Sequence, residues 1–571
     1  MVGARNIQCG FPLLVLLLGS GPGVEHARAQ FTSNYQTNVV SAATNNWPGN
    51  YCVGSNTFAN ALLVRNGGVL TNVDANVGYL SASSNNYVLV SGAGSVWSNA
   101  NLYLGCTGAG NALVVSNAGR IENAQAAYVA NDSASRSNRA LVTGANSVLD
   151  TVSALFVGYS GSGNSLTVSN GGRVANASGY VGDGSASSGN SVLITGADSV
   201  WSNYSTCIIG YQGNNNQVTI NKAGRLYSAY ATIGLLDAGA SNAVVVSDSG
   251  SLWDNSAVAS DINFGMMGSG NSLVVTNGAQ VLGYYAYFGR NVCGYNSALV
   301  SGPGSSFSVN CYIYTGNQGH HNSFTAANGA AISDKFCYIS YAAGSSNNSV
   351  FVTGTNTSWQ NSYSVFVGFD GVAGSLTISN GATMSTGGAF ATSHDGALGV
   401  DSTSSNNRAL VTGGGALWNC ADNVFIGLNG PANSLVISNG GKVICTTGYV
   451  GSNPGSDTNS ALVAGAGSVW TNSSDLYVGD FGVGNSLVLS NGGRAFSVNG
   501  YLARSSISAS NSVLVTGAGS SWTNSADVFV GYSGVGNSLV ISNGARVRNC
   551  SLGKAGQEGE TTIRRGAGGE G

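Results

Sequence analysis

The sequence predicts an all-β protein, a single-chain parallel β-helix of about 19 rungs, each about 26 residues long with three short strands. The first observation behind this prediction is a repeated phrase: NSLTVSNGGRVANASGYVG at Asn164 to Gly182 returns as NSLVISNGGKVICTTGYVG at Asn433 to Gly451. The second is that short apolar, β-branched segments alternate with Asn, Gly and Ser, which is typical of strands and turns. The third is that no apolar pattern of helical length occurs. A constant period of this size is typical of a solenoid, in which each unit closes its core by stacking on its neighbours.

The composition agrees with a folded solenoid. The 571 residues include 86 Gly and only 8% charged residues, while 43% are hydrophobic. Ordinary globular proteins have about 25% charged residues, so Asn, Ser and Thr must form most of the solvated surface here. The formal net charge is -3. No basic stripe that could neutralise phosphates is evident in the sequence, which argues against nucleic-acid binding.

The chain divides into four predicted parts. Residues 1–29 read as a secretory signal peptide, with Arg5, the apolar run FPLLVLLL from Phe11 to Leu18, and a small-x-small cleavage site ending at Ala29. The apolar run is too short for a membrane-spanning helix, which needs about 20 residues, and no later run is longer. Residues 30–50 are predicted to form a lead-in or cap, residues 51–550 the solenoid, and residues 551–571 a disordered tail. The protein is therefore expected to be exported, with no transmembrane helix in the mature chain.

The repeat is marked by the Asn that opens each rung. One series of opening residues is Asn60, Asn111, Asn164, Asn216, Asn271, Asn322, Gly374, Asn433, Asn485 and Asn537. A second series lies between them: Asn86, Asn138, Asn190, Asn242, Asn296, Asn348, Asn407, Asn459 and Asn511. Asn tolerates left-handed backbone angles and suits a corner, and identical amides stacked about 4.8 Å apart can also bond along the ladder. The sequence therefore predicts a structural Asn ladder.

Each rung contains three extended pieces, and the second piece differs between the two series. In the rung of Asn164 the pieces are Leu166 to Val168, the segment around Val174, and Tyr180 to Gly182. The core position of the second piece is aliphatic in the first series (Leu70, Ile121, Val174, Leu226, Val281, Ile332, Met384, Val443, Ala495 and Val547). In the second series it holds Leu149, Phe307 and seven tryptophans: Trp97, Trp201, Trp253, Trp359, Trp418, Trp470 and Trp522. Large side chains stacked between smaller ones fill a core without collision, so these tryptophans are predicted to form a buried structural ladder.

The recurrent motif resembles that of a known repeat family. The phrase VGYSGVGNSLVISNGARV at Val530 to Val547 is similar to the repeat shared by type V secretion (autotransporter) passengers and some PEP-CTERM exoproteins. The likeness covers roughly Tyr51 to Val547. It implies a secreted parallel β-helix displayed at a bacterial surface, and it implies no catalytic residues. The ending Ser551 to Gly571 resembles neither a membrane barrel nor a sorting helix, so the likeness is to the passenger part alone.

Aromatic residues recur in the third piece of the rung. Because strand side chains alternate between faces, these rings are expected to point outward, where they could contact sugar rings or simply stack upon one another. They are Tyr103, Tyr128, Phe156, Tyr180, Tyr287, Tyr312, Tyr338, Phe366, Phe425, Tyr449, Tyr477, Tyr501 and Phe529.

A second outward feature is suggested by runs of three apolar residues in the first piece of the second series, such as Val192 to Ile194. One interpretation is an outward apolar stripe that docks on another chain or a packed loop, which includes lateral self-association. The other is a bulge that shifts the register. The middle residues are Leu89, Leu141, Leu193, Val245, Leu299, Phe351, Leu410, Leu462 and Leu514.

The sequence predicts no catalytic residue, metal site or cofactor. A weak polar cluster, His394, Asp395 and Asp401, lies in a longer loop between Gly374 and Asn407 and is expected to be surface decoration. Glycan cleavage needs two carboxylates, or a base with charge neutralisation, and the segment has only Arg408 nearby.

Two cysteine pairs recur at the rung spacing, Cys311 with Cys337 and Cys420 with Cys445. Neighbouring rungs could bring each pair within bridging distance. Both disulfides and buried thiols are compatible with this spacing, and in-register parallel strands favour thiols.

The function expected from these observations is that of an exported bacterial β-solenoid, a non-enzymatic structural or adhesin-like passenger at the cell surface, at the outer membrane or outside the cell. Its expected partners are glycans or other surface proteins. The alternative is a polysaccharide-active lyase or hydrolase on a β-helix, which a cluster of three or more charged side chains on one face would favour.

Overall fold

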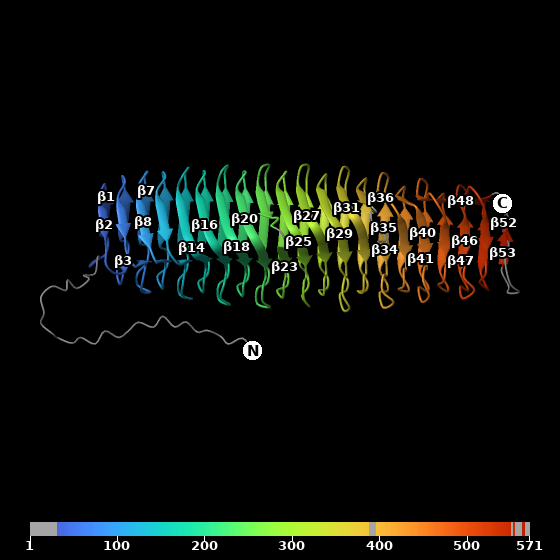
Figure 1. Ribbon diagram of the computed structural model, residues 1–571, viewed down its shortest axis with the longest axis horizontal. Helices are drawn as coiled ribbons and strands as arrows, with labels where there is room; N and C mark the ends of the chain where they lie inside the picture. The colour runs from blue at the N-terminus through green and yellow to red at the C-terminus, as the bar shows by residue number, and fades with distance from the viewer. Residues whose placement is uncertain (1–30, 258, 388–395, 550–551, 554–561, 566–571) are drawn as a thin grey trace.

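The protein is a long rod of stacked β-strands that lie across the rod axis, with the two ends of the described chain at opposite ends of the rod (Figure 1). The structure is a computed structural model that describes residues 31–257, 259–387, 396–549, 552–553 and 562–565. All of its regular elements are strands, and they form two parallel sheets of 21 and 32 strands. This is the parallel β-solenoid predicted from the repeat. Within the described residues, no helix is long and apolar enough to span a membrane.

The 21-stranded sheet contains the first strand of every rung. Its strands are β1 (Thr37–Ser41), β4 (Ala61–Arg65), β7 (Tyr87–Ser91), β10 (Ala112–Ser116), β13 (Arg139–Thr143), β15 (Ser165–Ser169), β17 (Ser191–Thr195), β19 (Gln217–Asn221), β21 (Ala243–Ser247), β24 (Ser272–Thr276), β26 (Ser297–Ser301), β28 (Ser323–Ala327), β30 (Ser349–Thr353), β32 (Ser375–Ser379), β35 (Arg408–Thr412), β38 (Ser434–Ser438), β41 (Ser460–Ala464), β44 (Ser486–Ser490), β47 (Ser512–Thr516), β50 (Ser538–Ser542) and β53 (Thr562–Arg565).

The 32-stranded sheet contains the second and third strands. The separate second strands are β2 (Thr44–Asn46), β5 (Val69–Thr71), β8 (Val96–Asn99), β11 (Arg120–Asn123), β22 (Leu252–Asn255), β33 (Thr383–Thr386), β36 (Leu417–Cys420), β39 (Lys442–Cys445), β42 (Val469–Asn472), β45 (Arg494–Ser497), β48 (Ser521–Asn524) and β51 (Arg546–Arg548). The separate third strands are β3 (Tyr51–Val53), β6 (Asp74–Val77), β9 (Asn101–Leu104), β12 (Ala127–Val129), β23 (Asp261–Phe264), β34 (Gly396–Leu398), β37 (Asn423–Ile426), β40 (Thr447–Val450), β43 (Leu476–Val478), β46 (Gly500–Leu502), β49 (Val528–Val530) and β52 (Leu552–Gly553).

In the middle of the rod the second and third strands run together. The continuous strands are β14 (Val148–Val157), β16 (Arg173–Val181), β18 (Val200–Ile209), β20 (Arg225–Ile233), β25 (Gln280–Phe288), β27 (Ser306–Thr315), β29 (Ala331–Ile339) and β31 (Ser358–Val367). Each continuous strand still bends between its two pieces. In β14 the bend is seen as a shift in its register with β16 between Thr151 and Ala154. The three pieces expected in each rung are thus present, but two of them share one strand here.

Strand pairing extends beyond the expected limits of the solenoid. At the N-terminal end, β1 and β2 already pair in parallel with β4 and β5, within the segment expected to be a cap. At the other end, β52 pairs with β49 and β53 pairs with β50. These last two strands fall within the segment expected to be a disordered tail.

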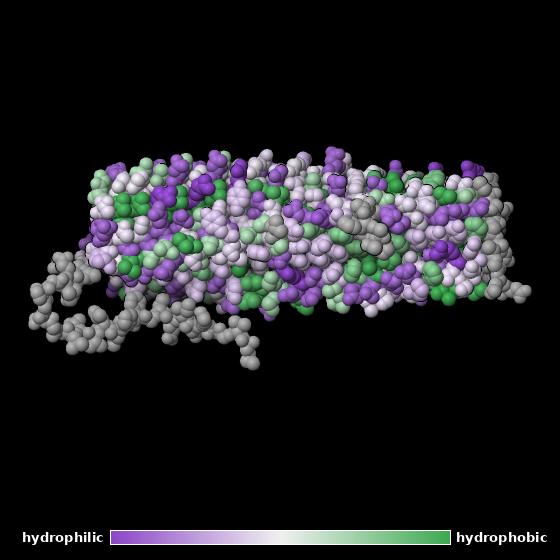
Figure 2. Space-filling model, in the orientation of Figure 1, coloured by the Kyte–Doolittle hydropathy of each residue, from purple (hydrophilic) through white to green (hydrophobic). Residues whose placement is uncertain are grey.

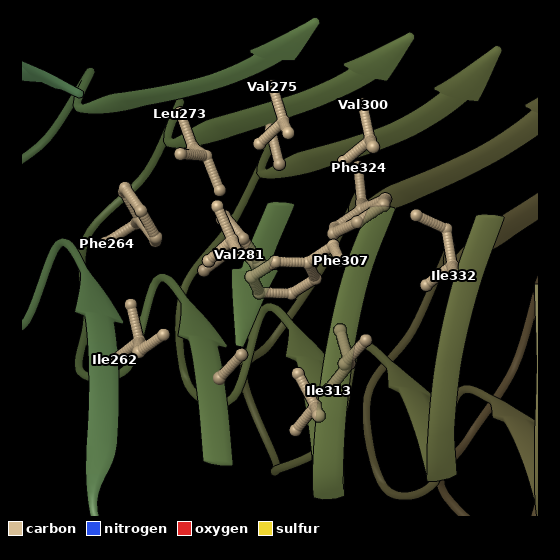
Figure 3. Close-up of a cluster of buried hydrophobic side chains, with 14 of the residues drawn as sticks. Ile262, Phe264, Leu273, Val275, Val281, Val300, Phe307, Ile313, Phe324 and Ile332 are labelled. Carbon is tan, nitrogen blue, oxygen red and sulfur yellow. The ribbon is translucent and has the colours of Figure 1, made fainter. Parts of the chain in front are cut away.

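The core lies between the two sheets, where side chains from both inner faces meet (Figure 3). In β15, Leu166 and Val168 are fully buried while Thr167 between them points outward, the period-two alternation of a strand with one buried face. Figure 3 shows Val275 and Val300 of the 21-stranded sheet facing Val281 and Phe307 of the 32-stranded sheet. The same alternation repeats in every rung, so the core is one continuous column.

The turn after the first strand explains the recurrent SNGG phrase. Asn170 and Gly171 both have left-handed backbone angles, with φ of 52° and 82°. A Cβ on the next residue, Gly172, would lie 2.4 Å from the carbonyl oxygen of Val142 on the preceding rung. Asn followed by two glycines therefore satisfies a turn that bulkier residues would obstruct.

Candidate functional site

The seven tryptophans of the predicted ladder lie inside the rod, each 0% or 1% exposed. Their partners in register are the expected smaller residues: Trp201 lies between Val174 and Leu226, and Trp522 between Ala495 and Val547. These rings are thus part of the core and are not accessible to a ligand. Their role in the fold is packing between the rungs.

The indole nitrogens show an inner polar row that the sequence analysis missed. Nε1 of Trp201 donates a hydrogen bond to Oδ1 of Asn176 at 2.7 Å, and Nε1 of Trp97 does the same to Asn72 at 2.7 Å. The acceptor lies 25 residues earlier, at the inward position two residues after the aliphatic core residue, as Asn176 follows Val174. The sequence does contain a signal for this polar row, because Asn, Ser, Thr, Asp or Cys occupies the position in most rungs.

The opening asparagines form a buried ladder that is interrupted at Gly374. The backbone N–H of Asn190 donates to Oδ1 of Asn216 at 2.9 Å, and the Asn190 side-chain amide donates to the same oxygen at 3.1 Å. Asn216 repeats both bonds to Asn242. The expected corner is displaced by one residue, since the left-handed backbone angle belongs to the residue before the ladder Asn, such as Asn215 with φ of 54°.

The third-strand aromatics stack face to face along the rod. Tyr103, Tyr128, Phe156 and Tyr180 form one run with ring centroids 4.7 to 5.0 Å apart. A second run is Tyr287, Tyr314, Tyr338 and Phe366, and a third is Phe425, Tyr449, Tyr477, Tyr501 and Phe529. Within these runs the ring faces contact one another, so only the ring edges and the ends of each run are open to a sugar.

The prediction that Tyr312 belongs to the aromatic row was wrong. Tyr312 pairs in register with Tyr285 and Phe336, whereas Tyr314 occupies the ladder position between Tyr287 and Tyr338. The bend in β27 adds residues before the third piece, so counting from the opening Asn selected the wrong tyrosine. Tyr314 is 8% exposed.

A hollow of about 380 Å³ opens beside the third aromatic run. Its lining residues are Tyr477, Phe481, Tyr501, Arg504, Ser505 and Tyr532. We call this hollow the aromatic hollow. The Tyr532 ring stands edge-on to Tyr501, with centroids 6.0 Å apart and planes at 79°. The aromatic hollow thus offers two rings outside the stack, Phe481 and Tyr532, and so a partly open aromatic surface.

Charge in the aromatic hollow is balanced by one ion pair. Arg504 Nε lies 2.5 Å from Oδ1 of Asp480, and the guanidinium stands 5.2 Å from the Tyr477 ring centroid. Burial raises the pKa of Asp480, although Arg504 opposes this shift. Burial also raises the pKa of Tyr501, so the phenol stays protonated and available as a hydrogen-bond donor at neutral pH. Aromatic rings beside a guanidinium can bind a polar, ring-shaped ligand such as a sugar.

The middle residues of the first strands point outward, as the stripe interpretation requires. Leu299 and Phe351 are 37% and 40% exposed, and the other predicted members are half-buried. The register is unbroken along this sheet: Leu299 pairs with Val274 and Thr325, and Phe351 pairs with Thr325 and Thr377. The alternative of a register-shifting bulge is therefore wrong. On the face shown in Figure 2, apolar patches are interspersed with polar side chains.

The register contradicts one predicted cysteine pair. Cys337 pairs with Ile313, while Cys311 lies within the bend of β27, because the bend displaces the count by two residues. Cys420 and Cys445 are both buried, 3% and 2% exposed. The Cys445 thiol is 3.1 Å from Oδ1 of Asn472, and burial raises its pKa to about 12. Cys445 is a thiol in the core.

The weak polar cluster is only partly covered by the structure. His394 and Asp395 lie outside the described residues. Asp401 is exposed, and its Oδ1 accepts a hydrogen bond from the backbone N–H of Ser402 at 2.6 Å. Among the residues that the structure describes, no group of three or more His, Cys, Asp or Glu could hold a metal ion.

The strand pairing defines the class of protein, a parallel β-solenoid. Comparison with known proteins finds no matching family model and no matching curated protein. One similar solved structure is a TibC-catalyzed hyper-glycosylated TibA fragment, at 11% identity and a TM-score of 0.27, covering 77% of this chain and 92% of that chain. At these values the fold assignment rests on the strand register of this chain itself.

Proposed function

We propose that the protein is an exported β-solenoid rod, displayed at a bacterial surface, that acts as a structural or adhesin-like passenger without catalysis. The observation that carries the proposal is the combination of an uninterrupted rod with the aromatic hollow on its outer face. A rod presents a binding surface at a distance from its attachment point, and aromatic rings beside Arg504 are suited to glycans. The repeat motif, which resembles that of autotransporter passengers, and the signal-like residues 1–29 support export.

An enzyme that acts on polysaccharides is the alternative, and one observation bears on it. Arg494, Arg546 and Arg548 line a single hollow on one face, which meets the expectation of three charged side chains. Among the residues that the structure describes, no carboxylate or imidazole lines that hollow, and guanidinium groups stay protonated at neutral pH. The cluster therefore supplies charge for binding but no group of the usual kind for proton transfer.

A glycan array and a glycan-degradation assay on the purified chain would test both functions together. We expect binding without cleavage, and we expect Tyr501→Ala with Tyr532→Ala to abolish most of the binding to glycans that carry no anionic groups. Tyr180→Ala is the matched control, because Tyr180 stacks on Phe156 at 4.7 Å in a run outside the aromatic hollow. Release of oligosaccharides would overturn the proposal that the protein is not an enzyme. If the double variant and the Tyr180→Ala control lost glycan binding equally, the aromatic hollow would be excluded as the binding site.

Export is tested separately. Residues 1–29 fused to a periplasmic reporter should direct secretion, and the mature protein should begin at Gln30. An uncleaved chain retained in the cytoplasm would contradict the proposed localisation, whatever the array shows.

A further inference from the structure

The outward face of the second strands changes its charge along the rod. In β11, β16 and β20 the first outward position holds Arg120, Arg173 and Arg225 on alternate rungs. Carboxylates accompany this part of the rod: Glu122 lies 3.0 Å from Arg120, and outward acidic residues follow in β14 and β22. The arginines of these rungs therefore stand in a mixed-charge surface.

Nearer the C-terminal end, all charged residues on the same face of the second strands are basic. The outward positions of β39, β42, β45, β48 and β51 carry Lys442, Arg494, Arg546 and Arg548 and no acidic residue. The described ion pairs involve Arg120, Arg290 and Arg504, and neither Arg494 nor Arg548 belongs to them. In a protein of net charge -3, this is a local concentration of positive charge.

Three neighbouring rungs shape this basic face into a trough. Arg494 and Phe496 of β45 pair in register with Ser521 and Thr523 of β48, which pair with Arg546 and Arg548 of β51. The two walls are thus two strand spacings apart, about 10 Å, with short hydroxyl side chains between them. These residues line a hollow of about 570 Å³, which we call the arginine trough. Long side chains flanking short ones are the physical cause of the hollow.

We propose that the arginine trough binds an oxyanion-bearing polysaccharide, one that carries carboxylate or sulfate groups. A planar guanidinium binds such a group through two parallel N–H donors, and guanidinium groups stand on both walls here. The Ser521 and Thr523 hydroxyls on the floor can bond sugar hydroxyls, and the half-buried Phe496 ring offers an apolar surface to a pyranose.

The geometry favours a saccharide over a nucleic acid. Proteins that bind duplex DNA with useful affinity make roughly 6–10 phosphate contacts, whereas only three arginines line the trough among the residues that the structure describes. The remainder of the rod face is neutral or of mixed charge, so a long phosphate backbone would gain few further contacts. A ligand whose oxyanions alternate with neutral, ring-shaped surface fits the trough better.

The assignment is independent of the proposed display at the cell surface and of the aromatic hollow, because it depends on different side chains. The test measures binding of the full chain to dextran sulfate, alginate, neutral dextran and a short duplex DNA, at low and at high salt. The test variant is Arg494→Gln with Arg548→Gln. The matched control is Arg173→Gln with Arg225→Gln, which removes the same charge at exposed outward positions of the same sheet, two rungs apart and separated by Val200.

We expect dextran sulfate and alginate to bind and neutral dextran not to bind. The test variant should weaken binding by about tenfold or more, as expected when charge-assisted hydrogen bonds are lost. The control should leave affinity unchanged, and Arg494→Lys with Arg548→Lys should restore part of the loss. Equal losses in test and control variants, or none in the test variant, would overturn the proposal. So would DNA that binds more tightly than either polysaccharide and responds to the same variants.

Discussion

The Ser340 hydroxyl accepts a hydrogen bond from the side-chain amide of Asn348 at 3.0 Å. Asn348 would otherwise donate to the next ladder residue, but Gly374 stands there and has no side chain. Ser340 occupies the position after the third strand that is Gly316 and Gly368 in the neighbouring rungs. A Cβ added to Gly374 would lie 3.2 Å from the Ser340 Oγ. The hydroxyl thus replaces the missing amide, and the two departures from the repeat compensate each other.

This compensation predicts a coupled pair of substitutions. Ser340→Gly should destabilise the protein by about 0.5–1.5 kcal/mol, because the Asn348 amide loses one of its three buried acceptors. Gly374→Asn should also destabilise it, because the new side chain meets Ser340. The double variant should be close to the natural protein in stability, which chemical denaturation would measure as a double-mutant cycle. Strictly additive effects would show that the two sites are not coupled.

Two tryptophans of the ladder should respond differently to the same substitution. Trp201→Phe should cost about 1–3 kcal/mol more than Trp418→Phe, because it leaves the Asn176 oxygen without its donor. Nε1 of Trp418 has no hydrogen-bond partner among the residues that the structure describes. Trp418→Phe therefore removes packing contacts but no hydrogen bond. Both losses can be read from urea denaturation midpoints. Equal effects would mean that the indole hydrogen bonds contribute little.

Asp334 makes stability depend on pH. It is 3% exposed, accepts hydrogen bonds from Trp359 and Asn361, and burial raises its pKa well above the ordinary value of 3.8. The folded state therefore binds this proton more tightly than the unfolded state, and the free energy of unfolding falls as pH rises from about 4 towards the folded pKa.

Asp334→Asn should consequently raise the melting temperature at neutral pH, and its advantage should shrink as the pH approaches 4. An amide at the equivalent inner position is already accommodated in this chain, where Asn176 donates to Asn203 at 2.6 Å. Thermal melts of both proteins across this pH range provide the measurement. A difference in melting temperature that does not change with pH would contradict the raised pKa as its cause.

The outward apolar stripe predicts lateral self-association of two rods through the 21-stranded sheet. Nineteen rungs spaced about 4.8 Å apart, with strands about 16 Å long, present roughly 1,400 Å² per rod. A stable interface buries about 800 Å² per partner, so the face is large enough. Leu299→Glu with Phe351→Glu should abolish concentration-dependent association in sedimentation velocity.

Leu282→Glu is the control for self-association, because Leu282 is an outward residue of the 32-stranded sheet. It should leave association unchanged. If the unsubstituted protein stays monomeric at high concentration, the apolar stripe is not an interface between two rods.

The repeat allowed most of the fold to be predicted, and a difference in strand length between the two series of rungs accounts for the errors. The alternation of Val174 with Trp201 and Leu226 could be counted directly from the opening asparagines, because the register is constant. Tyr312 and Cys311 were misplaced because β27, like β14, β18 and β31, has ten residues, whereas the continuous strands of the first series have nine. Counting along a chain cannot locate extra residues within a bend.

The candidate sites were less predictable than the fold. Tyr477 and Tyr501 were identified from their spacing. Arg504 joins them from the turn after the strand of Tyr501, and Tyr532 joins them from the turn after β49 of the next rung. The arginine trough was missed because its two walls lie about 52 residues apart in sequence, Arg494 against Arg546. Its floor depends on how short Ser521 and Thr523 are relative to their neighbours.

By itself the sequence determined the period, the strand class and which residues face inward, because a strand alternates with period two and the rungs repeat in register. The tertiary structure alone decided which outward side chains become neighbours. Residues such as Phe496 and Arg548 come together only because stacking places successive rungs one strand spacing apart. Hollows form where long and short side chains on adjacent rungs happen to alternate, a property of three rungs at once that no single repeat contains.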